Sequence, residues 1–357
     1  MSELIQKHDN CATIRWTLLT GVSVLALAAY ISAGSLAKAD DAKQPSIWLE
    51  VDGQLSWQDN SLDVYDPAFL AASPFDASSH TDLEKPPSTI WEKGAKLTYQ
   101  PDGSDWVLSL GARYGKSARL ETLNRQTALP SHTYSGAPVF GWQNAYQIFK
   151  AQSAESHTIV DFQAGKDVGL GMFGSGGRSV LSAGVRIAQF NSRGAVEIQS
   201  QPANVNGYYY YHIYRAKFDA RRKFTGVGPS ISWESSANIL GNSASSAISL
   251  DWGINGAVLF GRQRVDEEHQ TTDNYRHYFH YLKITTNHGG SPRSKQVTVP
   301  NIGGFAGLSW RAPNAKVSVG YRADMFFGAI DGGVDVAHRE NRGFYGPFAS
   351  VSVGLGG

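Results

Sequence analysis

Apolar and polar residues alternate one by one over long stretches of the chain. In residues 47–57 the odd positions are mostly apolar, whereas Glu50, Asp52, Gln54 and Ser56 occupy even positions. The same alternation returns at 91–99, 106–114, 160–165, 181–187, 248–260, 317–322 and 351–355. Because successive side chains of a strand point to opposite faces, this pattern predicts β-strands with one apolar and one polar face.

A β-sandwich, a β-helix and a membrane barrel all contain such strands. Sandwich strands usually have ~5–6 residues, whereas these segments are long enough for a tilted membrane crossing of ~9–11 residues. The sequence has no repeat of fixed period, which argues against a solenoid. Aromatic residues cluster at segment ends, as in the girdles of outer-membrane barrels. They are Trp48, Trp57, Trp91, Tyr99, Trp106, Tyr114, Trp310, Phe344, Tyr345 and Phe348. We therefore expect an all-β, transmembrane antiparallel β-barrel.

The connections between segments predict the topology. The expected strands lie at 46–57, 89–100, 104–115, 156–171, 179–190, 207–220, 224–234, 246–262, 274–286, 299–311, 314–327 and 343–355. This gives about 12 strands, with 10 to 14 left open. Long and short connections alternate over most of the chain, which is typical of long extracellular loops and short periplasmic turns. The pattern is weakest at 261–274, where a turn is needed and a charged stretch stands instead.

The N-terminus has the features of a secretory signal peptide. Lys7 and Arg15 precede the uncharged apolar run 16–31, and Ala37-Lys38-Ala39 matches an A-x-A cleavage site. A retained anchor is the alternative, but the run is short for a span of ~20 residues. We predict a cleaved signal peptide at 1–39 and a barrel at 40–357, exported to the outer membrane of a Gram-negative bacterium. The single cysteine, Cys11, would leave with the signal peptide.

Composition excludes other classes. The formal net charge of +1 offers no basic excess for nucleic acid. A mean hydropathy of −0.29 excludes a polytopic helical membrane protein. With 9 Trp, 16 Tyr and 16 Phe, the chain is too aromatic for a disordered protein.

Motifs that would carry catalysis or bind metal are weak. His277 and His280 would face opposite sides of one strand at a spacing of three residues, so they are not expected to share a metal. Asp266, Glu267 and Glu268 form a charge run that suits a solvated surface, with a divalent cation as the alternative. The sequence has no G-x-S-x-G, H-E-x-x-H or P-loop. We predict no enzyme activity, no catalytic or metal residues and no cofactor.

Charged residues on the inward faces are the candidate functional residues. The candidates for lining a pore are Glu50, Asp52, Glu92, Lys96, Asp105, Arg113, Asp161, Arg186, Asp251, Arg322 and Asp324. They would either bias the passage of solutes or pair across the lumen and fill a narrow barrel. The long segment 116–155 is a candidate constriction, and residues 142–150 within it have some helical periodicity.

Several segments resemble the Legionella-type major outer membrane protein family. They are residues 160–165 (VDFQAG), 183–188 (AGVRIA), 224–229 (FTGVGP), 319–322 (VGYR) and 344–348 (FYGPF). The resemblance covers about residues 155–355, and the first third of the chain matches only in pattern. The chain ends in Gly356-Gly357, whereas barrels of this class commonly end on an aromatic residue. The resemblance implies a pore-forming outer-membrane barrel.

Three function classes follow from these observations. The first is a porin-like channel for passive diffusion of small hydrophilic solutes or ions. The second is a structural or adhesive surface barrel, favoured by the long segments 58–88 and 116–155, and the third is an outer-membrane enzyme. Expected partners are outer-membrane lipid, the barrel-assembly machinery and small solutes, without nucleic acid. A homo-oligomer is left open.

Overall fold

The computed structural model of the chain consists of β-strands in the part that it describes. The described residues are 47–59, 89–101, 104–117, 120–125, 129–134, 137–141, 148–168, 178–200, 211–242, 246–277, 280–289, 292–333 and 337–355. Within these ranges, no helix has the length and apolarity needed to cross a membrane. The predicted signal peptide lies outside the described residues, and its cleavage near Ala39 stays a prediction.

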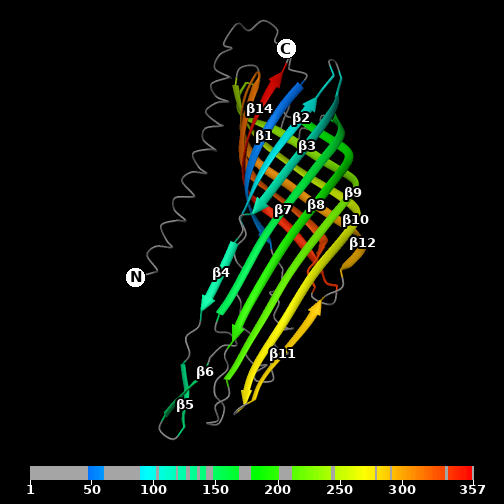
Figure 1. The fold of residues 1–357 in the computed structure, drawn as a ribbon. Helices are drawn as coiled ribbons and strands as arrows, with labels where there is room; N and C mark the ends of the chain where they lie inside the picture. Colours follow the sequence, from blue (N-terminus) through cyan, green and yellow to red (C-terminus); the bar gives the residue numbers. More distant parts are fainter. Residues whose placement is uncertain are drawn as a thin grey trace.

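Ten strands of the main sheet close into an antiparallel barrel (Figure 1). They are β1 (Ile47–Asp59), β2 (Thr89–Tyr99), β3 (Trp106–Ser117), β7 (Ile148–Asp167), β8 (Arg178–Ser200), β9 (Tyr211–Asn242), β10 (Ser246–His277), β12 (Arg293–Ala312), β13 (Ala315–Asp331) and β14 (Arg339–Leu355). Each strand pairs with its neighbours in this order, and β1 pairs with β14 to close the ring. The predicted all-β antiparallel barrel is therefore confirmed. The expected count of about 12 strands is not matched, and the ten strands observed fall at the lower limit of the range of 10 to 14 that was left open.

Four shorter strands lie outside the barrel wall. β4 (Leu120–Arg125) pairs with β7, and β11 (His280–Gly289) pairs with β10. β5 (Leu129–Tyr134) and β6 (Ala137–Gly141) form a separate two-stranded sheet. These additions lie at the end of the barrel opposite the C-terminus, where β7–β10 also extend beyond the wall (Figure 1).

The overcount has a physical cause in β9 and β10. The ranges 207–220 and 224–234 were expected to be two strands, but β9 runs from Tyr211 through the rest of both, and residues 207–210 lie outside the described residues. Likewise β10 runs without a turn through the charged stretch 261–274, and β11 pairs only with its outer part, from Glu268 to His277. The outward side chains from Arg262 to Glu268 are charged because the strand has left the apolar band. The change in polarity therefore marks a boundary of the band within one strand.

The segment 116–155 does not fold into the lumen in its described parts. β4 instead adds to the outer end of β7, with Leu120 opposite Ser153. The helical periodicity noted at 142–150 does not correspond to a helix at Ile148–Lys150, because these residues belong to strand β7. Residues 142–147 lie outside the described residues.

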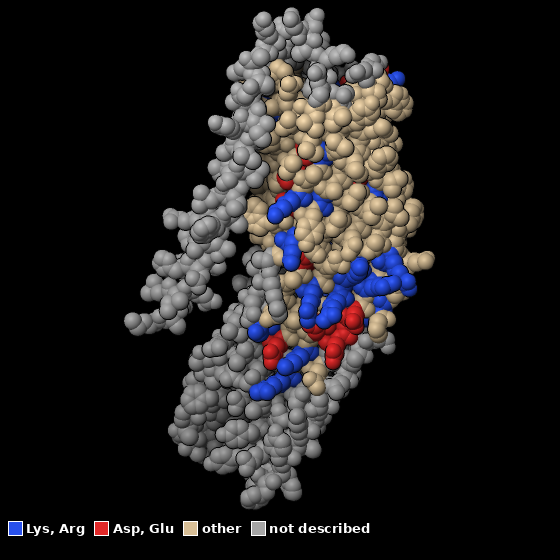
Figure 2. All heavy atoms as spheres, turned by 45° about the horizontal axis from the view of Figure 1, so that its top comes forward, with Lys and Arg blue, Asp and Glu red and all other residues tan. Residues whose placement is uncertain are grey.

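The outer surface of the barrel carries a continuous apolar band. Outward side chains such as Leu110, Phe162, Val227, Ile254 and Val319 are 48%, 56%, 48%, 55% and 56% exposed. On β10 the outward apolar residues run from Ile248 to Phe260, which at ~3.3 Å per residue and a tilt of ~40° covers roughly 25–30 Å. Figure 2 shows this surface as largely free of charge. Such a band suits the hydrocarbon region of a membrane.

The aromatic girdle is only partly as expected. Trp57, Trp91, Trp106 and Trp310 are outward and between 42% and 55% exposed. Phe344 and Phe348, which were expected in the same girdle, are 4% and 8% exposed and point into the lumen. Since Tyr345 is outward, the alternation of the strand requires its neighbour at 344 to face inward.

Candidate functional site

Charged side chains fill the part of the lumen nearest the C-terminus. The Lys96 Nζ atom lies 2.8 Å from Glu234 Oε1, and Asp251 contacts Arg311 at 2.8 Å and Lys316 at 2.6 Å. Lys96 and Glu234 are on β2 and β9, four strand-to-strand steps apart in a ring of ten. This pair therefore spans the lumen. Glu50, from the same part of the lumen, accepts a hydrogen bond of 2.9 Å from the Ser352 hydroxyl.

A second level of ion pairs lies deeper in the lumen. Arg322 of β13 contacts Asp52 of β1 at 2.9 Å, and Arg113 of β3 contacts Asp324 of β13 at 2.7 Å. The Arg322 guanidinium also lies 4.7 Å from the ring centre of Phe348. Since Arg113 and Asp324 are again four steps apart around the ring, this level is also bridged from wall to wall.

Arg186 organises the remaining polar groups of this level. Its guanidinium donates to both carboxylate oxygens of Asp161, at 2.6 Å and 3.0 Å, and to Asn255 at 2.8 Å. It also donates to the Asn301 side chain, three steps around the ring from β8. Arg186 is 3% exposed. A planar fork suits this arrangement, because its donors are spread over three nitrogen atoms, whereas the three donors of a lysine share one nitrogen and reach a smaller space.

The candidate residues therefore lie in pairs and not as a ring of free charges. Glu92 continues this network, accepting a hydrogen bond from the Ser56 hydroxyl and lying 3.4 Å from His157. Asp105 differs from the other candidates, because it is exposed in the turn before β3. The partners Glu234, Arg311, Lys316, Asn255 and Asn301 were missed. They could not be chosen from sequence because they depend on which strands face each other across the lumen.

An apolar layer crosses the lumen beyond the charged levels. The inward rings of Phe190, Phe326 and Phe344 come from β8, β13 and β14. The centroid of Phe190 lies 4.7 Å from that of Phe326 and 5.7 Å from that of Phe344. Phe224 stacks on Phe190 at 5.7 Å. The layer also contains Ile90, Ile159, Ala188, Ala257, Leu259, Val297, Val299, Ala329 and Ile330, each less than 10% exposed.

The sequence did contain a signal for this layer. Two adjacent apolar residues in a strand break the alternation, so one of them must face inward. Leu259-Phe260, Phe326-Phe327 and Phe344-Tyr345 are such pairs, and Leu259, Phe326 and Phe344 all belong to the layer.

A further polar level lies on the other side of the apolar layer. Glu155 accepts a hydrogen bond of 3.1 Å from Ser192 and lies 3.5 Å from Arg342, which is 1% exposed. Arg293 contacts Glu267 and lies 3.4 Å from Asp331. The lumen is thus crossed by side-chain contacts at several successive levels.

Metal binding finds no support in the described residues, where no group of three or more His, Cys, Asp or Glu is placed to hold an ion. Glu267 faces inward to Arg293, whereas Asp266 and Glu268 are outward and exposed, so the three carboxylates cannot share one cation. His277 and His280 were expected on opposite faces of one strand. They are instead register partners across the β10–β11 pair.

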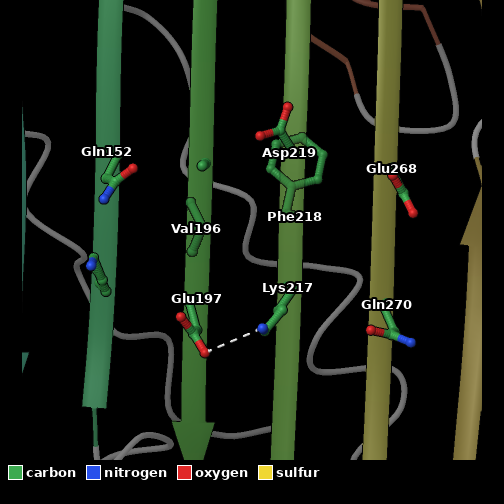
Figure 3. Close-up of a pocket in the computed structure, with 10 residues that line it drawn as sticks. Gln152, Val196, Glu197, Lys217, Phe218, Asp219, Glu268 and Gln270 are labelled. Carbon is green, nitrogen blue, oxygen red and sulfur yellow. Dashed lines mark ion pairs between the residues drawn. The ribbon is translucent and has the colours of Figure 1, made fainter. Parts of the chain in front are cut away.

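A pocket of about 360 Å³ lies on the outward face of the strands that extend beyond the band. β7, β8, β9 and β10 each contribute to it, and Figure 3 shows their side chains in a row across the sheet. Glu197 and Lys217 pair at 3.7 Å at one end of the pocket. Gln152 and Gln270 add polar groups from the outer strands.

No family model and no curated protein match the chain. Among solved structures, it is similar to the translocator domain of the autotransporter NalP from Neisseria meningitidis, with 7% identity and a TM-score of 0.30 over 95% of this chain and 97% of that one. It is also similar to LpxR from Salmonella typhimurium, with 11% identity and a TM-score of 0.24 over 86% of this chain and 100% of that one. TodX, the Pseudomonas putida toluene transporter, has 11% identity and a TM-score of 0.14 over 89% of this chain and 91% of that one. Similarities at these TM-scores define neither a shared fold nor a shared function.

Proposed function

We propose that the protein is an outer-membrane barrel with a closed lumen, which anchors and presents its extended strands at the cell surface. The apolar band supports a membrane location, because outward apolar side chains would otherwise meet water. The outer membrane is the bacterial membrane in which such barrels are found. The alternation of connection lengths supports an orientation with the C-terminus in the periplasm and β7–β10 extending outside.

The contact between Phe190 and Phe344 carries the proposal of a closed lumen. Their strands, β8 and β14, are five steps apart in a ring of ten, so they are on opposite walls. Ring centroids 5.7 Å apart leave no room for a water-filled path between them. The charged levels on both sides of the layer are also bridged, as in small barrels whose interior is filled by side chains.

A porin-like channel for small hydrophilic solutes or ions is the second candidate function. The polar inward faces favour it, as does the resemblance to the Legionella-type major outer membrane protein family. Passage would require the phenylalanine rings to move apart and several ion pairs to exchange partners. This candidate is therefore a channel that opens under a stimulus, whereas the closed scaffold has no open state.

Planar-bilayer recording separates the two candidates. Purified protein with a heat-modifiable folded band should give no steady conductance. The double substitution Phe190→Ala and Phe344→Ala removes the contact across the lumen and should introduce leak conductance. Phe162→Ala is the matched control, because it removes an outward phenylalanine that is 56% exposed and should leave the bilayer silent.

Steady ohmic conductance of the wild-type protein would overturn the closed scaffold and support a passive pore. Opening of the wild-type protein only above a threshold voltage would support the second candidate.

A further inference from the structure

Basic side chains cluster on the outward face immediately beyond the apolar band. Figure 2 shows blue side chains gathered where the largely uncharged surface ends. The cluster, called here the basic boundary cluster, consists of Lys116 on β3, Arg193 on β8, Arg221 and Lys223 on β9, and Arg262 and Arg264 on β10. All six are exposed and line a groove with a volume of about 660 Å³.

The cluster begins directly where the apolar band stops. On β10, Phe260 is the last large apolar residue of the band and is 57% exposed, and Arg262 is the next outward residue. On β9, Thr225 is the single outward position between Val227 and Lys223. One outward step corresponds to ~7 Å along a strand. The cluster therefore lies at the depth of lipid headgroups if the band lies in hydrocarbon.

Like charges face each other directly within the cluster. Arg193 is the register partner of Arg221 across β8 and β9, and Lys223 is the register partner of Arg264 across β9 and β10. Directly opposed like charges destabilise a sheet. An anion that lies between the strands would relieve this repulsion.

The protein itself offers little compensation for these charges. Arg193 and Arg221 share one carboxylate, that of Asp219, at 2.9 Å and 3.8 Å. Arg262 donates to a neutral acceptor, the Ser294 hydroxyl, at 2.6 Å. Lys223 and Arg264 have no ion-pair partner within the described part of the chain. Asp266, opposite Arg221, is the acidic residue of the groove on the outward face.

We propose that the basic boundary cluster binds the phosphate groups of a phosphorylated lipid in the outer leaflet. Arginine forks form charge-assisted hydrogen bonds with phosphate oxygens, and clustered Lys and Arg at a membrane boundary attract anionic headgroups. The acyl chains of the lipid would lie along Ile187, Val227 and Phe260 beneath the cluster. This inference rests on the membrane location proposed above but not on the closed lumen.

The test uses the double substitution Lys223→Gln and Arg264→Gln. Both side chains are exposed and without an ion-pair partner among the described residues, so the barrel should keep its heat-modifiable folded band. The matched control is Arg215→Gln with Lys217→Gln, which removes the same charge from outward positions of β9 farther from the band. Lipid retention is measured by native mass spectrometry of protein from mixed micelles containing lipid A, a diphosphorylated glycolipid, or its dephosphorylated form.

The wild-type protein and the control should retain lipid A, and K223Q/R264Q should bind it at least about tenfold more weakly, since each lost charged hydrogen bond corresponds to about this factor. The dephosphorylated lipid should not be retained. Equal retention of lipid A by wild type and K223Q/R264Q would overturn the proposal, as would equal retention of the two lipids.

Inorganic phosphate distinguishes a lipid site from a site for free anions. At millimolar concentration it should not displace lipid A, because the acyl chains contribute to binding. Complete displacement would overturn the assignment to a lipid. Loss of the folded band in every variant would instead contradict the barrel itself, so the two failures are distinguishable.

Discussion

Arg113 and Asp324 form an ion pair of 2.7 Å across the lumen, although they are on strands four steps apart around the barrel. The side chain of Asp324 is 3% exposed and that of Arg113 is 15% exposed. A carboxylate this well buried depends on its cation, because a lone charge in such a place has lost its water without replacement. The pair therefore ties opposite walls together.

Removal of one partner should destabilise the barrel strongly. For Arg113→Leu we expect the free energy of unfolding to fall by about 3–5 kcal/mol, measured by urea unfolding in detergent micelles. The double variant Arg113→Leu with Asp324→Leu should recover most of the loss, because no buried charge is then left unpaired. A single variant as stable as the wild type would show that the pair does not bear on stability.

The apolar band predicts opposite environments for two adjacent residues of β3. Leu110 is outward and 48% exposed, whereas Ser109 faces the lumen. In a Cys11→Ser background, Leu110→Cys should react with an apolar, membrane-confined maleimide, and Ser109→Cys should be protected from it. In the same strand, Leu110→Arg should cost about 2–4 kcal/mol of stability in lipid. Equal labelling of both cysteines by a water-soluble maleimide would contradict a lipid-facing band.

Close approach between strands makes one glycine much less replaceable than another. A Cβ at Gly228 on β9 would lie 1.8 Å from the main-chain oxygen of Val258, whereas a Cβ at Gly111 on β3 would meet nothing within 4 Å. Gly228→Ala should lower stability by about 1–3 kcal/mol, since the clash is with backbone. Gly111→Ala should be neutral or stabilise by up to about 1 kcal/mol. Thermal unfolding followed by circular dichroism compares the two, and similar losses would argue against the strand spacing described.

The fork of Arg186 should not be replaceable by an ammonium group. Arg186→Lys keeps the charge but loses several of the hydrogen bonds to Asp161, Asn255 and Asn301, each worth about 1.5–3 kcal/mol when one partner is charged. We expect a loss of at least about 2 kcal/mol in urea unfolding. Arg339→Lys at an exposed position of β14 is the control and should be silent. If Arg186→Lys left the free energy of unfolding unchanged, water would have to replace the missing donors.

The outward face of the barrel could be predicted from sequence because its side chains are apolar along the whole length of the band. The outward positions from Ile248 to Phe260 are nearly all apolar. The alternation with polar residues is therefore enough to identify both the strand and its outward face. The strand number could not be predicted in the same way, since the outward pattern ends at the edge of the band. Beyond Phe260, β10 continues with charged outward residues, and the loss of alternation looks like the end of a strand.

For the lumen, the sequence predicts which residues face inward but not which of them contact each other. The sequence places Asp52, Arg113 and Asp324 on inward faces, but their partners depend on the number of strands and the stagger between them. With 12 strands, Arg113 would face a different wall. The apolar layer was missed for another reason, because the alternation was interpreted as polar on every inward position, whereas Phe190, Phe224 and Phe344 occupy such positions.

The seam between β1 and β14 has a consequence for how the chain reaches this structure. Ile47 pairs with Leu355, so the ring closes between residues at opposite ends of the described chain. Pairing at such a sequence separation has a large loop-closure entropy and slows folding. Until β14 has arrived, β1 and β13 remain open edges that can pair with other chains. The arrival of β14, the last barrel strand of the described chain, therefore controls both the rate of closure and the time during which the open edges can pair with other chains.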